Sequence, residues 1–66
     1  MRIEINGRER ELDGPLSVGE IVDGEVADRR GVAVAVDGEV LPRGAWDDSL
    51  VADGTRLEIV GAVQGG

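Results

Sequence analysis

The first twenty residues decide the fold, and they read MRIEINGRERELDGPLSVGE (residues 1–20). Apolar Ile3 and Ile5 alternate with polar side chains, which is the period-two pattern of a half-buried strand. Asn6-Gly7 supplies the two positive-φ positions that a tight hairpin turn needs, and residues 8–12 return as a polar strand that we place at a sheet edge. The stretch therefore predicts an N-terminal β-hairpin.

A helix is expected directly after this hairpin. Asp13-Gly14-Pro15 interrupts the strand pattern, and Ser17 and Glu20 have the Ser-x-x-Glu spacing of a capping box. We predict a helix over residues 18–28, with four apolar residues on one face: Val18, Ile21, Val22 and Val26. Gly19 and Gly24 each cost roughly 1 kcal/mol relative to alanine, so packing must hold this helix more than propensity does.

A second hairpin follows the helix. Residues 32–36 read VAVAV and predict a strand covered on at least one face. Asp37-Gly38 is a second turn signal, and residues 39–41 form a short return strand that Pro42 stops.

The remaining body contains one more strand. Residues 47–52 predict an irregular crossing with a single helical turn, in which we interpret Asp47-Asp48 as a helix-start pair favoured by the helix dipole. Asp53-Gly54 makes a third turn, and residues 56–60 form the last strand, with Leu57 and Ile59 facing inward.

The order hairpin, helix, hairpin, crossing, strand predicts a two-layer α+β fold, in which a mixed sheet of about five strands packs on one helix. A right-handed crossover through the helix allows the first and last strands to pair in parallel at the sheet centre. That is the β-grasp architecture. We expect one β-grasp domain over residues 1–60 and a flexible tail over residues 61–66 that ends in Gly-Gly.

Composition excludes several classes of function. The chain has 14 acidic and 7 basic side chains, a net charge of -7, and no Cys, His, Tyr or Phe. All seven basic residues are Arg. Because most catalytic bases and nucleophiles are His, Cys, Lys or Tyr, we expect the chain not to be an enzyme, and we expect it to hold neither a metal nor a cofactor. An acidic surface also disfavours nucleic acid and favours a positively charged protein partner.

The sequence carries no membrane signal. The longest apolar run is Val32 to Val36, far below the ~18 residues that suggest a membrane span, and the first residues do not resemble a signal peptide. We therefore expect a cytoplasmic protein that does not associate with membranes.

We expect the end of the sequence to carry the chemistry, although a frayed terminus could also end in two glycines by chance. Residues 61–66 read GAVQGG and, fully extended, reach about 20 Å from the sheet. Paired glycines let a terminal carboxylate thread through a narrow channel of a partner, because residues without Cβ can approach the channel wall. The partner must supply the ATP chemistry, since this sequence has neither a GxxxxGK[ST] loop nor any Lys.

The sequence resembles the ThiS family of sulfur carrier proteins of thiamine biosynthesis, which are relatives of ubiquitin and of the molybdopterin synthase small subunit. The resemblance covers essentially the whole chain, and its more specific parts are the Pro-Arg-x-x-Trp spacing and the Gly-Gly end. It is carried by Ser17-Val18, by VAVAV leading into DGEVLPR (residues 32–43), by Trp46, by DGTRLEI (residues 53–59) and by Gly65-Gly66. Gln64 departs from the small or apolar residue typical of the family at this position.

The resemblance implies that an E1-like, ThiF-like adenylyltransferase uses ATP and Mg to adenylate Gly66. The adenylate would then become a thiocarboxylate, with sulfur from a donor such as a cysteine desulfurase, and would donate that sulfur to a ThiG-like thiazole synthase. Val63, Gln64 and Gly65 would thread into the partner. Relatives dock through the sheet face turned away from the helix, and the candidate docking residues here are Ala33, Ala35, Leu41, Arg43 and Trp46.

Other interpretations remain open at this point. Trp46 fits a core or rim packer beside Pro42 as well as a partner anchor, and Arg43 fits a solvated loop charge. The same tail could serve another pathway, such as molybdopterin, cysteine or siderophore-type assembly. The chain could also be a β-grasp interaction module whose tail is never modified.

Overall fold

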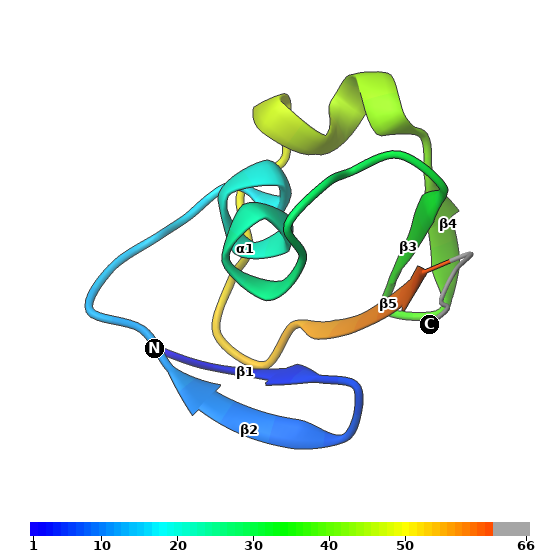
Figure 1. The fold of residues 1–66 in the computed structure, drawn as a ribbon. Coiled ribbons are helices and arrows are strands. Elements are labelled where there is room, and N and C mark those ends of the chain that lie inside the picture. The colour runs from blue at the N-terminus through cyan, green and yellow to red at the C-terminus, as the bar shows by residue number, and fades with distance from the viewer. Residues whose placement is uncertain (62–66) are drawn as a thin grey trace.

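The computed structural model describes residues 1–61. Five strands form one mixed sheet in the order β2-β1-β5-β3-β4, with β1 and β5 parallel and the other neighbours antiparallel. Figure 1 shows how the sheet curves around the helix α1. This arrangement confirms the predicted α+β β-grasp fold. The elements are β1 (Arg2–Ile5), β2 (Arg8–Glu11), α1 (Val18–Glu25), β3 (Val32–Val36), β4 (Glu39–Leu41), the 3-10 helix η1 (Arg43–Asp48) and β5 (Arg56–Gly61).

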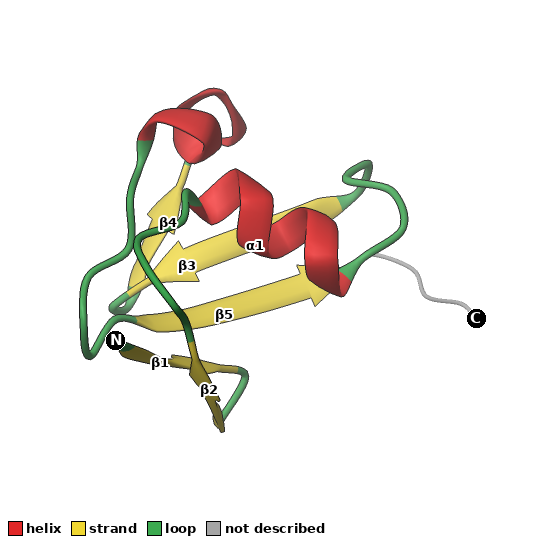
Figure 2. Ribbon diagram, turned by 90° about the vertical axis from the view of Figure 1, so that its left-hand side faces the viewer, coloured by secondary structure: helices red, strands yellow, loops and turns green. Residues whose placement is uncertain are grey.

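The core lies between α1 and one face of the sheet. Figure 2 shows α1 crossing that face. The strands β1, β3 and β5 bury alternate side chains against the helix, whereas all four residues of the edge strand β2 are exposed. The helix is eight residues long, and no helix within residues 1–61 is long and apolar enough to cross a membrane. The buried apolar residues are Ile3, Ile5, Leu12, Val18, Ile21, Val22, Val32, Val34, Trp46, Val51, Leu57 and Ile59.

Both predicted hairpin turns are present. Asn6 and Gly7 have φ angles of 51° and 84°, and Asp37 and Gly38 have φ angles of 49° and 90°. Two successive positive φ values define the turn that matches the right-handed twist of a two-residue hairpin. The turns therefore fix the registers of β1 with β2 and of β3 with β4.

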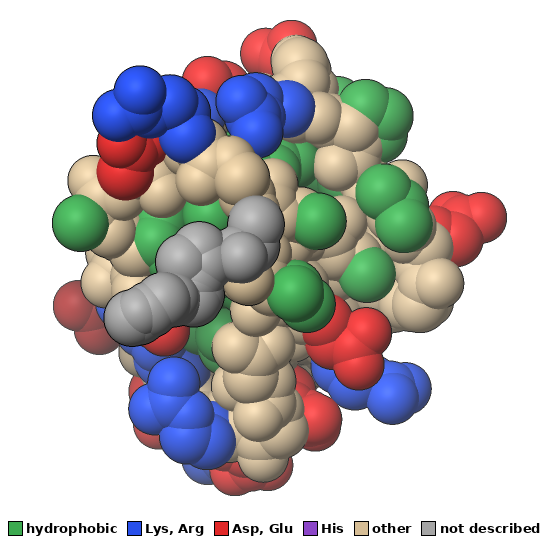
Figure 3. All heavy atoms as spheres, turned by 45° about the vertical axis from the view of Figure 1, so that its right-hand side comes forward, with side chains coloured by type: hydrophobic (Ala, Val, Ile, Leu, Met, Phe, Trp, Pro, Cys, Tyr) green, Lys and Arg blue, Asp and Glu red, His purple; other side chains and the backbone are tan. Residues whose placement is uncertain are grey.

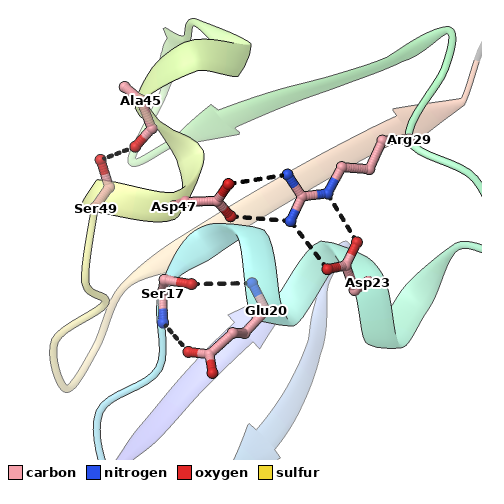
Figure 4. A network of polar contacts seen from close by, with 7 residues as sticks. All are labelled: Ser17, Glu20, Asp23, Arg29, Ala45, Asp47 and Ser49. Atoms are coloured by element: carbon pink, nitrogen blue, oxygen red, sulfur yellow. Dashed lines mark hydrogen bonds and ion pairs between the residues drawn. The ribbon is translucent and has the colours of Figure 1, made fainter.

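The predicted capping box begins α1. The Ser17 hydroxyl accepts from the Glu20 backbone N–H at 3.0 Å, and the Ser17 N–H donates to the Glu20 carboxylate at 2.9 Å (Figure 4). The helix ends at Glu25, three residues before the predicted end. The Asp28 carboxylate accepts from the Arg30 backbone N–H at 2.9 Å, a local turn that competes with helical hydrogen bonding.

The helical turn in the crossing segment lies earlier than predicted. It spans Arg43–Asp48 and follows Pro42, the N-cap residue, whose backbone is extended with φ of -59° and ψ of 144°. Asp47 and Asp48 therefore stand at the end of η1, so their interpretation as a helix-start pair was wrong. Burial of Trp46 fixes the position of this turn, because its indole is only 1% exposed and its N–H donates to the Leu41 carbonyl at 2.9 Å.

The last strand is one residue longer than predicted. β5 runs through Gly61, which pairs with Val32 of β3. The strand thus includes the first residue of the expected tail.

Candidate functional site

The predicted tail residues lie outside the described residues. They are Gly66, which we expect to be modified, and Val63, Gln64 and Gly65, which we expect to thread into the partner. The described chain ends with Gly61 at the end of β5. The functional geometry that the structure describes is therefore the base of the tail and the sheet face beside it.

An apolar patch covers one half of the outer sheet face, the face turned away from α1. It consists of Ala33 and Ala35 of β3, Val40 of β4 and Val60 of β5. Ala33 pairs with Val60 and Ala35 pairs with Val40, so the four side chains are neighbours on the same face. Val40 is 77% exposed and Val60 is 62% exposed, and hydrophobic side chains gather on this side of the molecule (Figure 3).

The sequence alternation of β3 creates this patch. Val32 and Val34 are buried against α1, so the alanines between them must point outward. The sequence prediction found Ala33 and Ala35 but missed Val40 and Val60. The signal for Val40 was present, because a two-residue turn at residues 37 and 38 places residue 40 opposite residue 35.

Two of the predicted docking residues belong to the core side instead. The same turn register places Leu41 opposite Val34, where it packs against the core. Trp46 is buried, so its ring cannot be presented to a partner in this conformation. The interpretation of Trp46 as a core packer holds.

Arg43 lies apart from the alanines, at the start of η1. It is exposed, and its guanidinium carbon lies 5.8 Å from the centroid of the Trp46 ring. That distance permits a cation–π contact, so Arg43 covers the outer side of the buried indole.

The other half of the outer face is charged. On β1 and β2, Glu4 pairs with Glu9 and Arg2 pairs with Glu11. Arg2 lies 3.9 Å from the Glu9 carboxylate and 4.0 Å from the Glu11 carboxylate, with all three side chains more than half exposed. Such exposed ion pairs contribute little to the stability of the fold. Three carboxylates beside one Arg also leave this part of the face with an excess of negative charge. We call Glu4, Glu9 and Glu11 the acidic half of the face.

A network of charged side chains joins α1 to η1 on the opposite side of the molecule. Arg29 donates to both carboxylate oxygens of Asp23 at 2.8 and 2.9 Å and to Asp47 at 3.0 and 3.4 Å (Figure 4). The Arg29 hydrogen bonds lower the pKa of Asp23, and the two carboxylates raise the pKa of Arg29. The guanidinium carbon of Arg29 also lies 5.6 Å from the Trp46 ring centroid. We call Asp23, Arg29 and Asp47 the clasp, because they link elements that are separated in the sequence.

A second ion pair is purely local. Arg30 donates to the Asp28 carboxylate at 2.8 Å, and this bond lowers the pKa of Asp28. Within residues 1–61, no group of three or more His, Cys, Asp or Glu side chains is arranged to hold a metal ion.

Comparison with known proteins gives consistent matches. The family model of the ThiS family matches residues 3–66. The crystal structure of a thiamine biosynthesis protein (ThiS) from Geobacter metallireducens has a TM-score of 0.82 and 36% identity, and the match covers 100% of both chains. A solution NMR structure of a thiamine biosynthesis protein from the same organism has a TM-score of 0.80 and 36% identity, covering 100% of this chain and 88% of that one.

A curated relative is considerably longer. A thiazole synthase from Paramagnetospirillum magneticum is 35% identical over 66 residues, a match that covers 100% of this chain but 20% of that protein. The present chain thus corresponds to one fifth of that relative. The family match over nearly the whole sequence and the agreement in fold over the described residues lead to one conclusion: the chain belongs to the ThiS family.

Proposed function

We propose that this chain is a sulfur carrier of thiamine biosynthesis whose reactive group is the Gly66 carboxylate. The observation that carries the proposal is the family match, which runs through residue 66 and so includes the Gly-Gly pair. The chain acts as a protein substrate of partner enzymes, which fits an inventory without His, Cys, Lys or Tyr.

The chemistry has two steps. A carboxylate is inert toward nucleophiles at neutral pH, so an E1-like enzyme with Mg-ATP transfers AMP to the Gly66 carboxylate and releases pyrophosphate. The product is a mixed anhydride. Sulfide, which a thiol reductant releases from the persulfide of a donor such as a cysteine desulfurase, then attacks the acyl carbon, AMP leaves, and a thiocarboxylate remains at Gly66. That sulfur is donated for formation of the thiazole ring.

The outer sheet face is suited to receive the activating enzyme. The apolar patch exposes large side chains at Val40 and Val60, and Val60 immediately precedes the last described residue. Exposed apolar clusters of this kind are typical of interaction sites. A partner seated on the patch is therefore close to the base of the tail. The acidic half favours a partner that carries basic side chains beside an apolar surface.

The acceptor of the sulfur is proposed to be a thiazole synthase. The relative with that name includes a segment that matches all 66 residues of this chain. Joining a carrier and its acceptor in one polypeptide raises their effective concentration, which is useful only when the two act together. A carrier and an acceptor made as separate chains would meet through the same surfaces.

The experiment that tests the adenylation step is pyrophosphate exchange into ATP, catalysed by a ThiF-like enzyme in the presence of this chain. We expect exchange with the full sequence and none when Gly66 is deleted, because deletion shortens the tail and removes the acceptor carboxylate from its place. Equal exchange with and without Gly66 would contradict the assignment of the reactive group. Exchange with neither chain would favour an interaction module with an unmodified tail.

A further inference from the structure

Asn6 connects the first hairpin to the last strand at two consecutive points. Its backbone N–H donates to the Leu57 carbonyl at 2.9 Å. Its side-chain Oδ1 accepts from the Ile59 N–H at 2.8 Å, and its Nδ2 donates to the Ile59 carbonyl at 3.2 Å. One side chain therefore satisfies both backbone groups of Ile59.

This contact extends the parallel pairing of β1 with β5 beyond the end of β1. The backbone register pairs only Glu4 with Arg56 and Ile5 with Leu57, after which β1 turns away toward β2. The carboxamide of Asn6 presents one donor and one acceptor at the same end, as a peptide group does. It acts as one more rung of the ladder where no backbone of β1 remains.

Few residues can fill this role. Asn6 has a φ of 51°, a left-handed conformation that Gly, Asn and Asp tolerate best. Glycine has no side chain with which to bind Ile59, and an ionised aspartate has no donor for the Ile59 carbonyl. Asparagine meets both the turn requirement and the hydrogen-bond requirement.

The rung is placed near the base of the tail. Beyond Ile59, β5 continues through Val60 to Gly61, and its described pairing there is with β3 alone. The rung at Ile59 is thus the last point within residues 1–61 at which β5 is held from both sides. Losing it would leave the end of β5 attached along one edge.

The second hairpin offers a matched comparison. Asp37 has a φ of 49° in the same kind of turn, and its carboxylate accepts from the Arg56 N–H at 2.9 Å. Asp37 therefore binds β5 at its beginning, whereas Asn6 binds it near its end. In both contacts a side-chain oxygen of the turn residue accepts from a backbone N–H of β5. The two contacts differ in their distance from the tail.

We propose that Asn6 is a positioning residue that fixes the direction in which the tail leaves the sheet, and so aligns Gly66 with an activating enzyme docked on the apolar patch. This inference rests on the proposed function. Asn6 lies in the turn after β1, on the side of β5 opposite to β3 and β4. The inference gives this turn residue a role in presenting the tail.

The test compares Asn6→Gly, Asn6→Asp and Asp37→Gly with the wild-type chain in two measurements. The first is amide hydrogen exchange at Ile59, whose N–H donates to the Asn6 side chain, and it needs no partner. Loss of one hydrogen bond typically costs about 1 kcal/mol, so we expect exchange at this amide to be up to about tenfold faster in Asn6→Gly. Asn6→Asp retains the acceptor for the Ile59 N–H and should be intermediate. Asp37→Gly should leave the Ile59 amide protected.

The second measurement is the KM and kcat of adenylation by a ThiF-like enzyme. Asn6→Gly should raise KM by up to about tenfold with little change in kcat, because the end of β5 that Asn6 no longer holds must be ordered when the enzyme binds. Asp37→Gly should leave KM unchanged even if it lowers the melting temperature equally. Equal KM values for Asn6→Gly and wild type, or an equal rise in Asp37→Gly, would overturn the positioning role.

The two measurements separate the failure of this inference from the failure of the proposed function. If the wild-type chain is not adenylated but Asn6→Gly speeds exchange at Ile59, the proposed function fails while the rung itself stands. If exchange does not respond to Asn6→Gly, the rung does not hold the end of β5 and the inference fails, whatever the adenylation assay gives.

Discussion

At the scale of single residues, two glycines of α1 occupy opposite environments. A Cβ added at Gly19 would collide with the Asp47 carboxylate and the Arg29 guanidinium of the clasp. A Cβ added at Gly24 would meet nothing within 4 Å. The sequence assigned both glycines the same cost to the helix, but only the one at position 24 is open to substitution.

We therefore predict opposite outcomes for the two alanine substitutions. Gly24→Ala should raise the free energy of unfolding by about 0.5–1 kcal/mol, because alanine restricts the unfolded chain and favours the helix. Gly19→Ala should give no such gain, because its methyl group displaces Asp47 from Arg29. Urea denaturation followed by the fluorescence of the single Trp46 measures both changes.

The clasp explains the difference only if removing both colliding side chains restores the gain. In an Arg29→Ala, Asp47→Ala background, Gly19→Ala should stabilise the helix as Gly24→Ala does. An equal stabilisation by Gly19→Ala in the wild-type background would show that the clasp does not oppose a side chain at this position.

At the scale of elements, the strands were more predictable than the helices. Each hairpin turn is encoded by two adjacent residues, so the registers of β1–β2 and β3–β4 follow from local sequence. The bounds of the helices depend on contacts that are distant or easily missed. Past the end of α1, Val26 is already extended and the Asp28 side chain binds the Arg30 N–H. The position of η1 follows from burial of Trp46 and its hydrogen bond to the Leu41 carbonyl.

The same reasoning applies to the candidate site. The outward alanines of β3 could be predicted from alternation alone. Leu41 was predicted on the outer face in place of Val40, because the register of the second hairpin was not carried through to β4. To predict that Val60 belongs to the patch, one must know that β5 pairs with β3, which is a contact between segments distant in the sequence. The sequence therefore predicted which sheet face is apolar but not all of the residues that form the patch.

The edge strand β2 illustrates how charge is divided between the two sheet faces. Arg8 and Arg10 bind Glu25 of α1 at 3.5 and 3.1 Å, while Glu9 and Glu11 face outward. If two copies joined antiparallel through β2 in one continuous sheet, each face would bring like charges together. This arrangement disfavours edge-to-edge association of the chain.

The clasp predicts an acid sensitivity that depends on Arg29. Because Arg29 lowers the pKa of Asp23 in the folded chain, the ionised carboxylate stabilises the fold above its ordinary pKa near 4. That stabilisation should be lost as the pH falls through the lowered folded-state pKa. We expect Arg29→Gln to be less stable than wild type at pH 7, with the difference shrinking below about pH 4.

Arg30→Gln is the matched control for this pH dependence. It removes an equally short ion pair, but one between residues two apart in the sequence that can also form in the unfolded chain. Urea denaturation at pH 7 and at pH 3 should show a much smaller change for Arg30→Gln. Equal changes in the free energy of unfolding for the two variants would mean that linking α1 to η1 adds nothing to stability.

At the scale of the whole molecule, the outer sheet face is divided into an apolar patch and an acidic half, and the tail base adjoins the patch. Two exposed residues test whether the patch is used. Val40→Asp places a charge in the patch, whereas Leu50→Asp places the same charge at another exposed apolar residue, 69% exposed and outside the patch. Both variants carry the same net charge.

We expect Val40→Asp to weaken binding of the ThiF-like enzyme at least about tenfold, since it introduces a charge that must be desolvated at the interface. Leu50→Asp should bind as wild type does. Both should change the free energy of unfolding by less than about 0.5 kcal/mol, because both sites are exposed. Titration calorimetry measures the binding, and equal weakening by the two variants would reject the patch as the docking surface.

The central claim is that Gly66 carries sulfur, and intact-mass spectrometry tests it most directly. After incubation with a ThiF-like enzyme, Mg-ATP and a sulfide source, the account predicts that the chain gains the mass of one oxygen-to-sulfur exchange. The gain should map to Gly66 and be absent from the chain lacking that residue. An unchanged mass, under conditions in which the same enzyme modifies a known ThiS protein, would contradict the claim.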